Sequence, residues 1–175
     1  MQAVVDHRTM FRSYCIRAGS MNDQSLWKQS GLRNNVSIPA GMHLLGDAGY
    51  KMFRHLLTPF EEEEAAKNTK KRRYNYKHSQ TRITVERSFG ILKNHYRILL
   101  GKIQQKTPKN VTRVIVSCLV LHNLMIELRD TYRVVGSDPN CAQYSVLTSL
   151  DVEDHLSHEQ GLMKQAEIME YLSCL

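Results

Sequence analysis

The sequence predicts a mixed α/β domain, and two kinds of residue pattern indicate this class. Near the N-terminus, β-branched and aromatic residues form short runs, whereas later segments repeat apolar residues at helical spacing. The chain has 175 residues, of which 42% are hydrophobic and 23% charged, as in an ordinary globular protein. This length suits one domain with its own core. We expect residues 1–130 to form that domain, followed by a C-terminal loop and an acidic helical tail over 131–175.

The first part of the chain is expected to contain a hairpin and a short helix. Residues 2–6 and 11–18 are rich in strand-forming side chains and flank a polar turn, which predicts an antiparallel hairpin. The segment Asn22–Ser30 then predicts a short helix that buries Leu26 and Trp27. Its first residue is a polar side chain suited to capping the free N–H groups of a helix.

The next segment places one acidic residue at the end of a strand. Residues 42–45 read as a short buried strand, and Asp47 follows directly, between two glycines. In open α/β sheets, ligands bind beyond the carboxyl ends of the strands, so Asp47 lies where chemistry is usually found. Residues 51–57 are expected to be helical. Residues 61–73 carry an acidic block and then a basic block, and they predict a polar, mobile loop.

Two longer helices are predicted in the second half of the chain. From about residue 79 to 99 a single apolar stripe recurs at helical spacing. It consists of Val85, Phe89, Leu92, Tyr96 and Leu99. A second helix, opened by Pro108 and Asn110, is expected over residues 111–128 as a mostly buried core helix, with His122 as a hydrogen-bonded core imidazole. A weaker acidic helix is expected over residues 151–172.

Basic charge is concentrated in one part of the sequence. Residues 67–113 contain fourteen Lys and Arg residues and a single acidic residue, Glu86. Such a stretch is typical of a surface that faces nucleic-acid phosphates, and the alternative is a solvated basic face. The basic residues expected to contact DNA are Arg82, Arg87, Lys93 and Arg97. The run Lys70, Lys71, Arg72 and Arg73 predicts a nuclear-import signal, with phosphate contact as the alternative.

Several classes of protein are disfavoured by the sequence. The longest apolar run, Val114–Ile126, falls short of the roughly 20 residues that cross a bilayer, and no secretion signal follows Met1, so no membrane association is expected. The four cysteines are scattered without a CxxC pair, which predicts reduced thiols in an intracellular protein. Nucleophile-elbow, P-loop and dinucleotide-binding motifs are absent from the sequence, which argues against serine hydrolases and nucleotide-binding enzymes.

Asp47 and Glu86 are the candidate metal ligands. Carboxylates from a strand end and a helix suit Mg²⁺ or Mn²⁺, and two such ions can support phosphoryl transfer by activating the attacking oxygen and stabilising the leaving one. On a helix, Glu86 shares a flank with Arg82, Gly90 and Lys93, and the glycine leaves room beside the carboxylate. The competing interpretation is an exposed aspartate in a glycine turn, together with a surface glutamate that pairs with Arg82.

Six segments, taken in order, resemble the PIF/Harbinger-type DDE transposases, a group that also includes transposase-derived host proteins. They cover about residues 2–128 and read AVVDHRTMF, AGSMND, LLGDAGY, LLTPF, YNYKHSQTRITVERSFGILKNHYRIL and VSCLVLHNLM. The resemblance implies an RNase H-like mixed sheet with flanking helices, and a triad of two aspartates and one glutamate that binds divalent metal to cut and join DNA. By motif match, Asp47 resembles the second aspartate and Glu86 the glutamate. Asp6 and Asp23 match positions that are commonly acidic in the family but lie outside its triad.

The chain also departs from the family pattern. The family's first catalytic aspartate lies on a first strand upstream of the segment that here begins at Gln2, so residues 1–130 resemble a partial nuclease domain without that strand. We therefore expect a nuclear, DDE-type endonuclease domain that is inactive in this truncated form; replacement of the lost ligand by Asp6 is a weaker alternative. The rival function is a non-catalytic derivative that binds DNA or chromatin proteins, and a purely structural basic protein leaves Asp47 and Glu86 unexplained. The family often uses a Myb-like DNA-binding partner.

Overall fold

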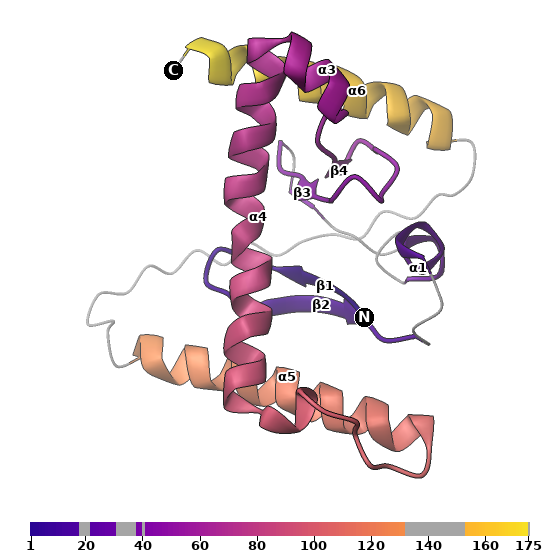
Figure 1. The fold of residues 1–175 in the computed structure, drawn as a ribbon, viewed down its shortest axis with the longest axis vertical. Helices are drawn as coiled ribbons and strands as arrows, with labels where there is room; N and C mark the ends of the chain where they lie inside the picture. Colours follow the sequence, from indigo (N-terminus) through magenta and orange to yellow (C-terminus); the bar gives the residue numbers. More distant parts are fainter. Residues whose placement is uncertain (18–21, 31–37, 40, 132–152, 175) are drawn as a thin grey trace. The chain divides into compact units, whose positions relative to one another are not determined.

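The computed structural model describes residues 1–17, 22–30, 38–39, 41–131 and 153–174 (Figure 1). They form helices and two small sheets, which confirms the mixed α/β class. The chain divides into two compact units, each with its own hydrophobic core. Unit 1 comprises Met1, Ala3–Ile16 and Ile83–Ala142, and unit 2 comprises Gln2, Arg17–Arg82 and Gln143–Leu175. The larger RNase H-like sheet, and the lack of its first strand, stay predictions.

Unit 1 contains the expected hairpin, except for its first residue, Gln2. Strands β1 (Gln2–Val5) and β2 (Phe11–Cys15) form a two-stranded sheet, and a connection this short permits only antiparallel pairing. The side chain of Asp6 holds the turn, because its Oδ1 accepts hydrogen bonds from the backbone N–H groups of Arg8 (2.9 Å) and Met10 (3.0 Å). Thr9 completes the turn with a positive φ of 66°.

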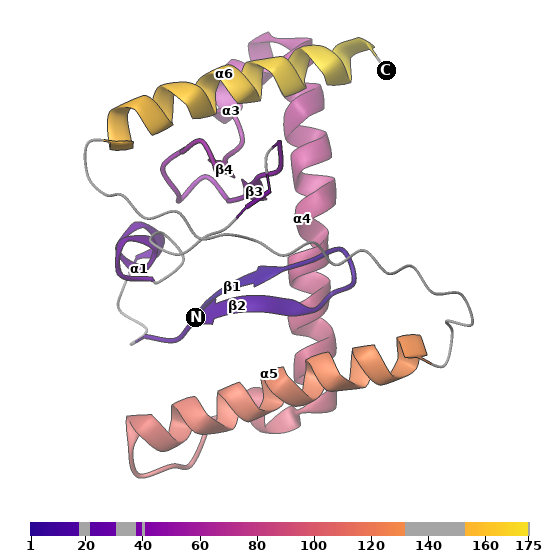
Figure 2. The same cartoon turned by 180° about the vertical axis from the view of Figure 1, so that it is seen from behind.

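The core of unit 1 lies between the hairpin and two helices (Figure 2). Helix α4 (Thr69–His95) contributes its C-terminal part, followed by a short 3₁₀ helix η1 (Arg97–Leu99), and helix α5 (Pro108–Thr131) crosses beside them. The buried centre and the side chains packed around it include Phe11, Leu92, Cys118, Leu119, Phe89, Tyr96 and Leu99. Phe89 and Leu92 of the predicted apolar stripe therefore face the core from α4, whereas Tyr96 and Leu99 reach it from beyond the end of that helix at His95.

Helix α5 is only partly buried, so the expectation of a mostly buried core helix is wrong. One face, with Leu119 and His122, is buried, whereas a second apolar face is exposed. The exposed residues are Val120, Leu121, Leu124, Met125 and Leu128. Within the part of the chain that the structure describes, Pro108–Leu128 is also the one helix long and apolar enough to cross a membrane, with a mean hydropathy of 1.6, a test that core helices of soluble proteins also pass. By this measure the expectation that no segment reaches a membrane-spanning length is wrong.

Unit 2 begins with the predicted short helix, α1 (Asp23–Gln29). The side chain of Asn22 caps it by accepting a hydrogen bond from the Ser25 N–H at 2.8 Å. Trp27 is buried and stacks on Phe53, with the ring centroids 6.3 Å apart. The sequence pattern thus predicted both the cap and the buried face of this helix.

Two short strands follow, and they correct one expectation. Strand β3 (Leu44–Leu45) lies where a strand was predicted, and it pairs in parallel with β4 (Leu56–Leu57). The second strand falls within residues 51–57, which were expected to be helical. A window of seven residues is too short to define a helical period, and Pro59 favours extended backbone just before it. Both residues of β4 are buried, so packing decides the conformation.

The charged segment after β4 is helical rather than a mobile loop, which is a second correction. Helix α3 (Glu62–Lys67) has acidic residues in its first turn and a lysine in its last, as the helix dipole favours. Helix α4 then begins at Thr69, about ten residues earlier than predicted. Asn68 makes this possible, because its side chain accepts a hydrogen bond from the Lys70 N–H at 2.9 Å.

The acidic C-terminal helix is present as α6 (Glu153–Cys174), close to its predicted bounds. It packs on β4 within unit 2 (Figure 1). The buried side chain of Gln165 donates a hydrogen bond to the Thr58 carbonyl at 2.8 Å. Gly161 allows the close approach, since a Cβ atom there would lie 2.8 Å from the backbone of Phe53.

Candidate active site

Asp47 lies two residues beyond the end of β3, as predicted. Gly46 fixes the chain just before it by donating its N–H to the Leu57 carbonyl at 2.8 Å. A side chain at Gly46 would crowd Leu56 and Tyr50, because a Cβ atom would approach them to 3.1 and 3.3 Å. Asp47 itself shapes the turn that follows, since its Oδ1 accepts a hydrogen bond from the Gly49 N–H at 3.0 Å.

The other carboxylate oxygen of Asp47 faces a cation. Arg82 Nη2 lies 3.5 Å from Asp47 Oδ2, and both residues belong to unit 2. The two side chains are 31% and 40% exposed, respectively, so solvent reaches this ion pair. The competing interpretation paired Arg82 with Glu86, but in the described part of the chain the ion pair of Arg82 is with Asp47.

Glu86 lies on the exposed surface of α4, in unit 1. The helix runs unbroken from Thr69 to His95, so Arg82, Glu86 and Lys93 share one face, as the spacing predicted. Gly90 lies on this face too, and a Cβ atom there would meet nothing within 4 Å. The room beside the glutamate that the sequence suggested is therefore present. The convergence of Asp47 and Glu86 on a pair of divalent cations stays a prediction.

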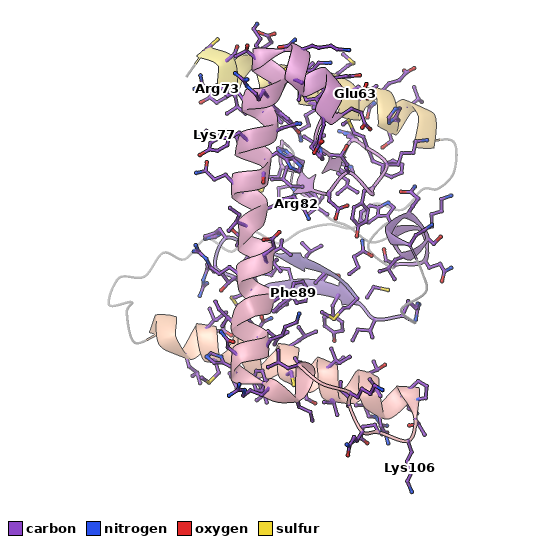
Figure 3. The ribbon with its side chains drawn as sticks, in the orientation of Figure 1. Glu63, Arg73, Lys77, Arg82, Phe89 and Lys106 are labelled. Atoms are coloured by element: carbon purple, nitrogen blue, oxygen red, sulfur yellow. The ribbon has the colours of Figure 1, made fainter. Side chains whose placement is uncertain are left out.

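The other cations chosen as DNA contacts are exposed, but they do not all lie on one helix. Arg87 and Lys93 are exposed on α4. Arg97 is exposed on η1, because α4 ends at His95, earlier than the sequence pattern predicted. Figure 3 marks Arg82 and Phe89 on α4.

Sequence reasoning missed two histidines of unit 2, His78, whose ring feels the charge of Asp47, and His43. His78 precedes Arg82 by one turn of α4, and its Nε2 lies 3.3 Å from the Leu57 carbonyl oxygen. Burial lowers the pKa of His78, and the positive charge of Arg82 adds to this effect. Burial likewise lowers the pKa of His43, with Lys164 and His78 contributing. The i, i+4 spacing of His78 and Arg82 was visible in the sequence, but the helix was expected to begin only after His78.

The four residues predicted as an import signal occupy the first turns of α4, and two of them are engaged inside unit 2. Lys70 Nζ lies 2.6 Å from Glu170 Oε2, which joins α4 to α6. Lys71 Nζ lies 2.6 Å from Glu64 Oε2 and 4.8 Å from the centre of the Phe60 ring. The other two, Arg72 and Arg73, are exposed, and Figure 3 marks Arg73.

Asp6 is committed to the hairpin turn, which argues against its use as a substitute metal ligand. Its Oδ2 lies 2.7 Å from Arg12 Nε, in addition to the two backbone contacts of Oδ1. Burial alone would raise the pKa of Asp6, but the hydrogen bond from Met10 and the contact with Arg12 lower it overall. The side chain of Asp23 lies outside the described residues.

The side chains of Asp47 and Glu86 have the chemistry of ligands for a divalent cation. Asp47 and Glu86 supply hard carboxylate oxygens, and Mg²⁺ is commonly bound through one or two carboxylates together with water and substrate phosphates. Among the residues that the structure describes, no group of three or more His, Cys, Asp or Glu side chains could form a complete metal cage. A metal bound at either carboxylate would need further ligands, such as water and substrate phosphates.

The fold and these motifs define a class of protein. Residues 1–123 match the family described as DDE superfamily endonuclease, and the chain belongs to this family. It is similar to "Putative nuclease HARBI1" of Bos taurus, with 33% identity over 146 residues, or 77% of this chain and 40% of that protein. The same-named protein of Homo sapiens is 34% identical over 115 residues, which cover 62% and 32% of the two chains.

A plant relative extends the comparison. "Protein ALP1-like" of Arabidopsis thaliana is 26% identical over 146 residues, which cover 74% of this chain and 36% of that protein. This chain therefore spans between 32% and 40% of the length of these three relatives. No solved structure matches the chain.

Proposed function

We propose that the chain carries part of the active site of a metal-dependent, DDE-type endonuclease that acts on DNA phosphodiesters. In this proposal Asp47 and Glu86 are ligands of Mg²⁺ or Mn²⁺. The main support for the proposal is the position of Arg82. Arg82 pairs with Asp47 at 3.5 Å, and it lies on the same face of α4 as Glu86. Family membership adds to it, because both residues lie within the matched segment.

In this proposal the residues of the chain have two roles, which are to position the carboxylates and to bind the DNA backbone. Gly46 and the turn after Asp47 hold this carboxylate at the end of β3, and α4 fixes Glu86. A bound divalent metal would supply charge for the phosphodiester oxygens as the bond breaks. Arg82, Arg87, Lys93 and Arg97 would hold the DNA backbone through its phosphates, which positions DNA without reading its sequence.

We propose further that these 175 residues cleave DNA negligibly by themselves. Support comes from the described residues, in which no group of three or more His, Cys, Asp or Glu side chains could hold a metal ion. Incubation of purified chain with supercoiled plasmid and Mg²⁺ or Mn²⁺ is expected to leave the plasmid intact. Metal-dependent nicking that Asp47→Ala abolishes would contradict this and would mean that the chain completes its own triad.

A nuclear location is proposed from the basic run Lys70–Arg73. Two of its lysines form ion pairs in unit 2, so an import receptor would have to compete with Glu170 and Glu64. Changing all four basic residues to Ala in a tagged chain should move it to the cytoplasm. Unchanged nuclear retention would mean that the basic run contacts phosphate instead. Import would then depend on a partner, such as the Myb-like protein that the family resemblance suggests.

A second candidate function is a non-catalytic protein that binds DNA or chromatin proteins. The exposed apolar face of α5 favours it, because contiguous exposed apolar surface often marks a protein-binding site. The two candidates differ in what they require of Asp47. A binding protein keeps its DNA affinity and has no use for a metal, whereas the endonuclease requires the carboxylate for metal binding.

Mn²⁺ binding separates these candidates. Free Mn²⁺ is measured by electron paramagnetic resonance while the full chain is titrated. We expect Asp47→Asn to abolish site-specific binding and Glu63→Gln to leave it unchanged, because Glu63 is an exposed residue of α3 that carries the same charge (Figure 3). Equal binding by both variants and the unaltered chain would contradict the metal site and favour the binding protein.

A further inference from the structure

Both oxygens of the Asp47 carboxylate are already engaged. Oδ1 accepts the Gly49 N–H at 3.0 Å, and this contact belongs to the turn that follows β3. Oδ2 faces Arg82 Nη2 at 3.5 Å. A cation that binds at Oδ2 would therefore occupy the space in front of this oxygen that the guanidinium now fills. Arg82 and a metal ion would compete for this one carboxylate oxygen.

The ion pair between Asp47 and Arg82 is weak enough for a divalent cation to displace the arginine. Strong charge-assisted hydrogen bonds have N···O distances of about 2.7–2.9 Å, which is shorter than the 3.5 Å found here. The partial exposure of both side chains lets water screen their attraction, and ion pairs of this kind contribute little to stability. A divalent cation carries twice the charge of the guanidinium and approaches a carboxylate oxygen more closely.

We propose that Arg82 is a positioning residue that holds Asp47 while no metal is bound and that leaves Asp47 when a divalent cation binds. The released guanidinium is then free to bind a DNA phosphate on the face of α4 that also carries Lys93, three turns further along the helix. The inference rests on the proposed function, because it assigns Asp47 as a metal ligand. It adds a coupling between the sites: the cation strengthens phosphate binding at Arg82, and phosphate strengthens cation binding by the same factor.

Mn²⁺ affinity tests the competition directly. Arg82→Gln removes the competitor, so the full chain should bind Mn²⁺ about two- to fivefold more tightly, the range expected for a partly exposed ion pair. Lys77→Gln removes the same charge from α4, and Lys77 contacts Gln80 and Tyr76 rather than Asp47 (Figure 3). It should leave Mn²⁺ affinity unchanged. If Arg82→Gln lowers the thermal midpoint, Arg82→Met, which also removes the charge but keeps a long side chain for packing, replaces it.

DNA binding without divalent metal gives an independent test. Asp47→Asn should release Arg82 and strengthen duplex binding severalfold at low salt, and adding Arg82→Gln should remove that gain. Glu63→Gln removes an equal negative charge elsewhere in unit 2 and should have a smaller effect.

The outcomes distinguish failure of this inference from failure of the proposed endonuclease function on which it rests. Asp47-dependent Mn²⁺ binding that is equal in the Arg82→Gln and Lys77→Gln chains overturns the inference and leaves the proposed function standing. Absence of Mn²⁺ binding from both the unaltered and the Arg82→Gln chains overturns both. Tighter binding in Arg82→Gln alone, together with the gain of DNA affinity in Asp47→Asn, supports the competition.

Discussion

The side-chain amide of Asn123 on α5 pairs with both backbone polar groups of Phe11 on β2. Its Oδ1 accepts the Phe11 N–H at 2.8 Å, and its Nδ2 donates to the Phe11 carbonyl at 2.8 Å. The neighbouring His122 is 1% exposed, and its Nε2 donates to the Thr9 carbonyl at 2.9 Å, which confirms the core imidazole predicted from the sequence. Two adjacent side chains of one helix thus satisfy backbone groups of the hairpin that would otherwise lack partners.

Asn123→Ala should destabilise unit 1. It leaves the backbone N–H and carbonyl of Phe11 without their partners in a partly buried position, which should cost about 2 kcal/mol of unfolding free energy. The measurement is urea denaturation followed by circular dichroism. Asn94→Ala, at an exposed position of α4, is the control and should change the free energy by less than about 0.5 kcal/mol. Equal effects of the two substitutions would contradict the pairing.

The two faces of α5 should respond differently to truncation. Leu119 is 1% exposed in the core of unit 1, so Leu119→Ala should lower the unfolding free energy by about 2–5 kcal/mol. Leu121, two residues along the same helix, is 46% exposed, and its change to Ala should have an effect below about 0.5 kcal/mol. A large loss from Leu121→Ala in the purified chain would mean that a second surface covers this face.

Acidification should destabilise unit 2. The pKa values of His43 and His78 are lowered, mainly by burial, so the unfolded chain binds more protons than the folded one as the pH falls through the ordinary histidine pKa. The contribution of these groups is complete above about pH 6.5 and is lost as the pH falls from there toward their folded-state pKa values. The positive charges near them, Arg82 and Lys164, reinforce this direction, whereas Asp47 opposes it at His78.

Thermal unfolding between pH 7.5 and 5.5 tests this expectation. The melting midpoint should fall with pH, and the double variant His43→Asn and His78→Asn should show a smaller fall. His95 is exposed and supplies a control, since His95→Asn should leave the pH dependence unchanged. A pH dependence that the double variant retains in full would assign it to other groups.

DNA binding should depend steeply on salt and little on sequence. The four proposed contacts, Arg82, Arg87, Lys93 and Arg97, would release counterions, which gives a slope of log K against log salt of roughly −3.6 on duplex DNA. Changing all four to Ala should flatten this slope in a fluorescence-anisotropy titration with two unrelated duplexes. A nearly flat dependence in the unaltered chain, or a strong preference for one duplex, would contradict a surface that contacts the DNA backbone.

Local sequence patterns predicted the features that depend on neighbouring residues. The Asn22 cap, the stripe through Leu92 and the position of Asp47 after a strand each follow from a few adjacent side chains. The early start of α4 was missed because a charged block without apolar periodicity looks like a loop. Here Asn68 caps the helix, and Lys71 pairs with Glu64 across the junction between the two helices.

Other features depend on residues far apart in the sequence. The pairing of Leu44 with Leu56, the contact between Asn123 and Phe11 and the ion pair between Arg82 and Asp47 each require tertiary packing. For the candidate site, the sequence identified Asp47, Arg82 and Glu86 as residues of interest. The competing interpretation paired Arg82 with Glu86, one turn away, because helical spacing was the only geometry that the sequence supplied.

The central proposal is that Asp47 and Glu86 both serve one divalent-metal site, and a double-mutant cycle of Mn²⁺ affinity tests it most directly. The chains compared are the unaltered protein, Asp47→Asn, Glu86→Gln and the double variant. If both carboxylates hold one ion, each single change removes most of the specific binding, and the double variant is little weaker than either, which is strong non-additivity. Independent, additive losses, or unchanged affinity in Glu86→Gln, would contradict a shared metal.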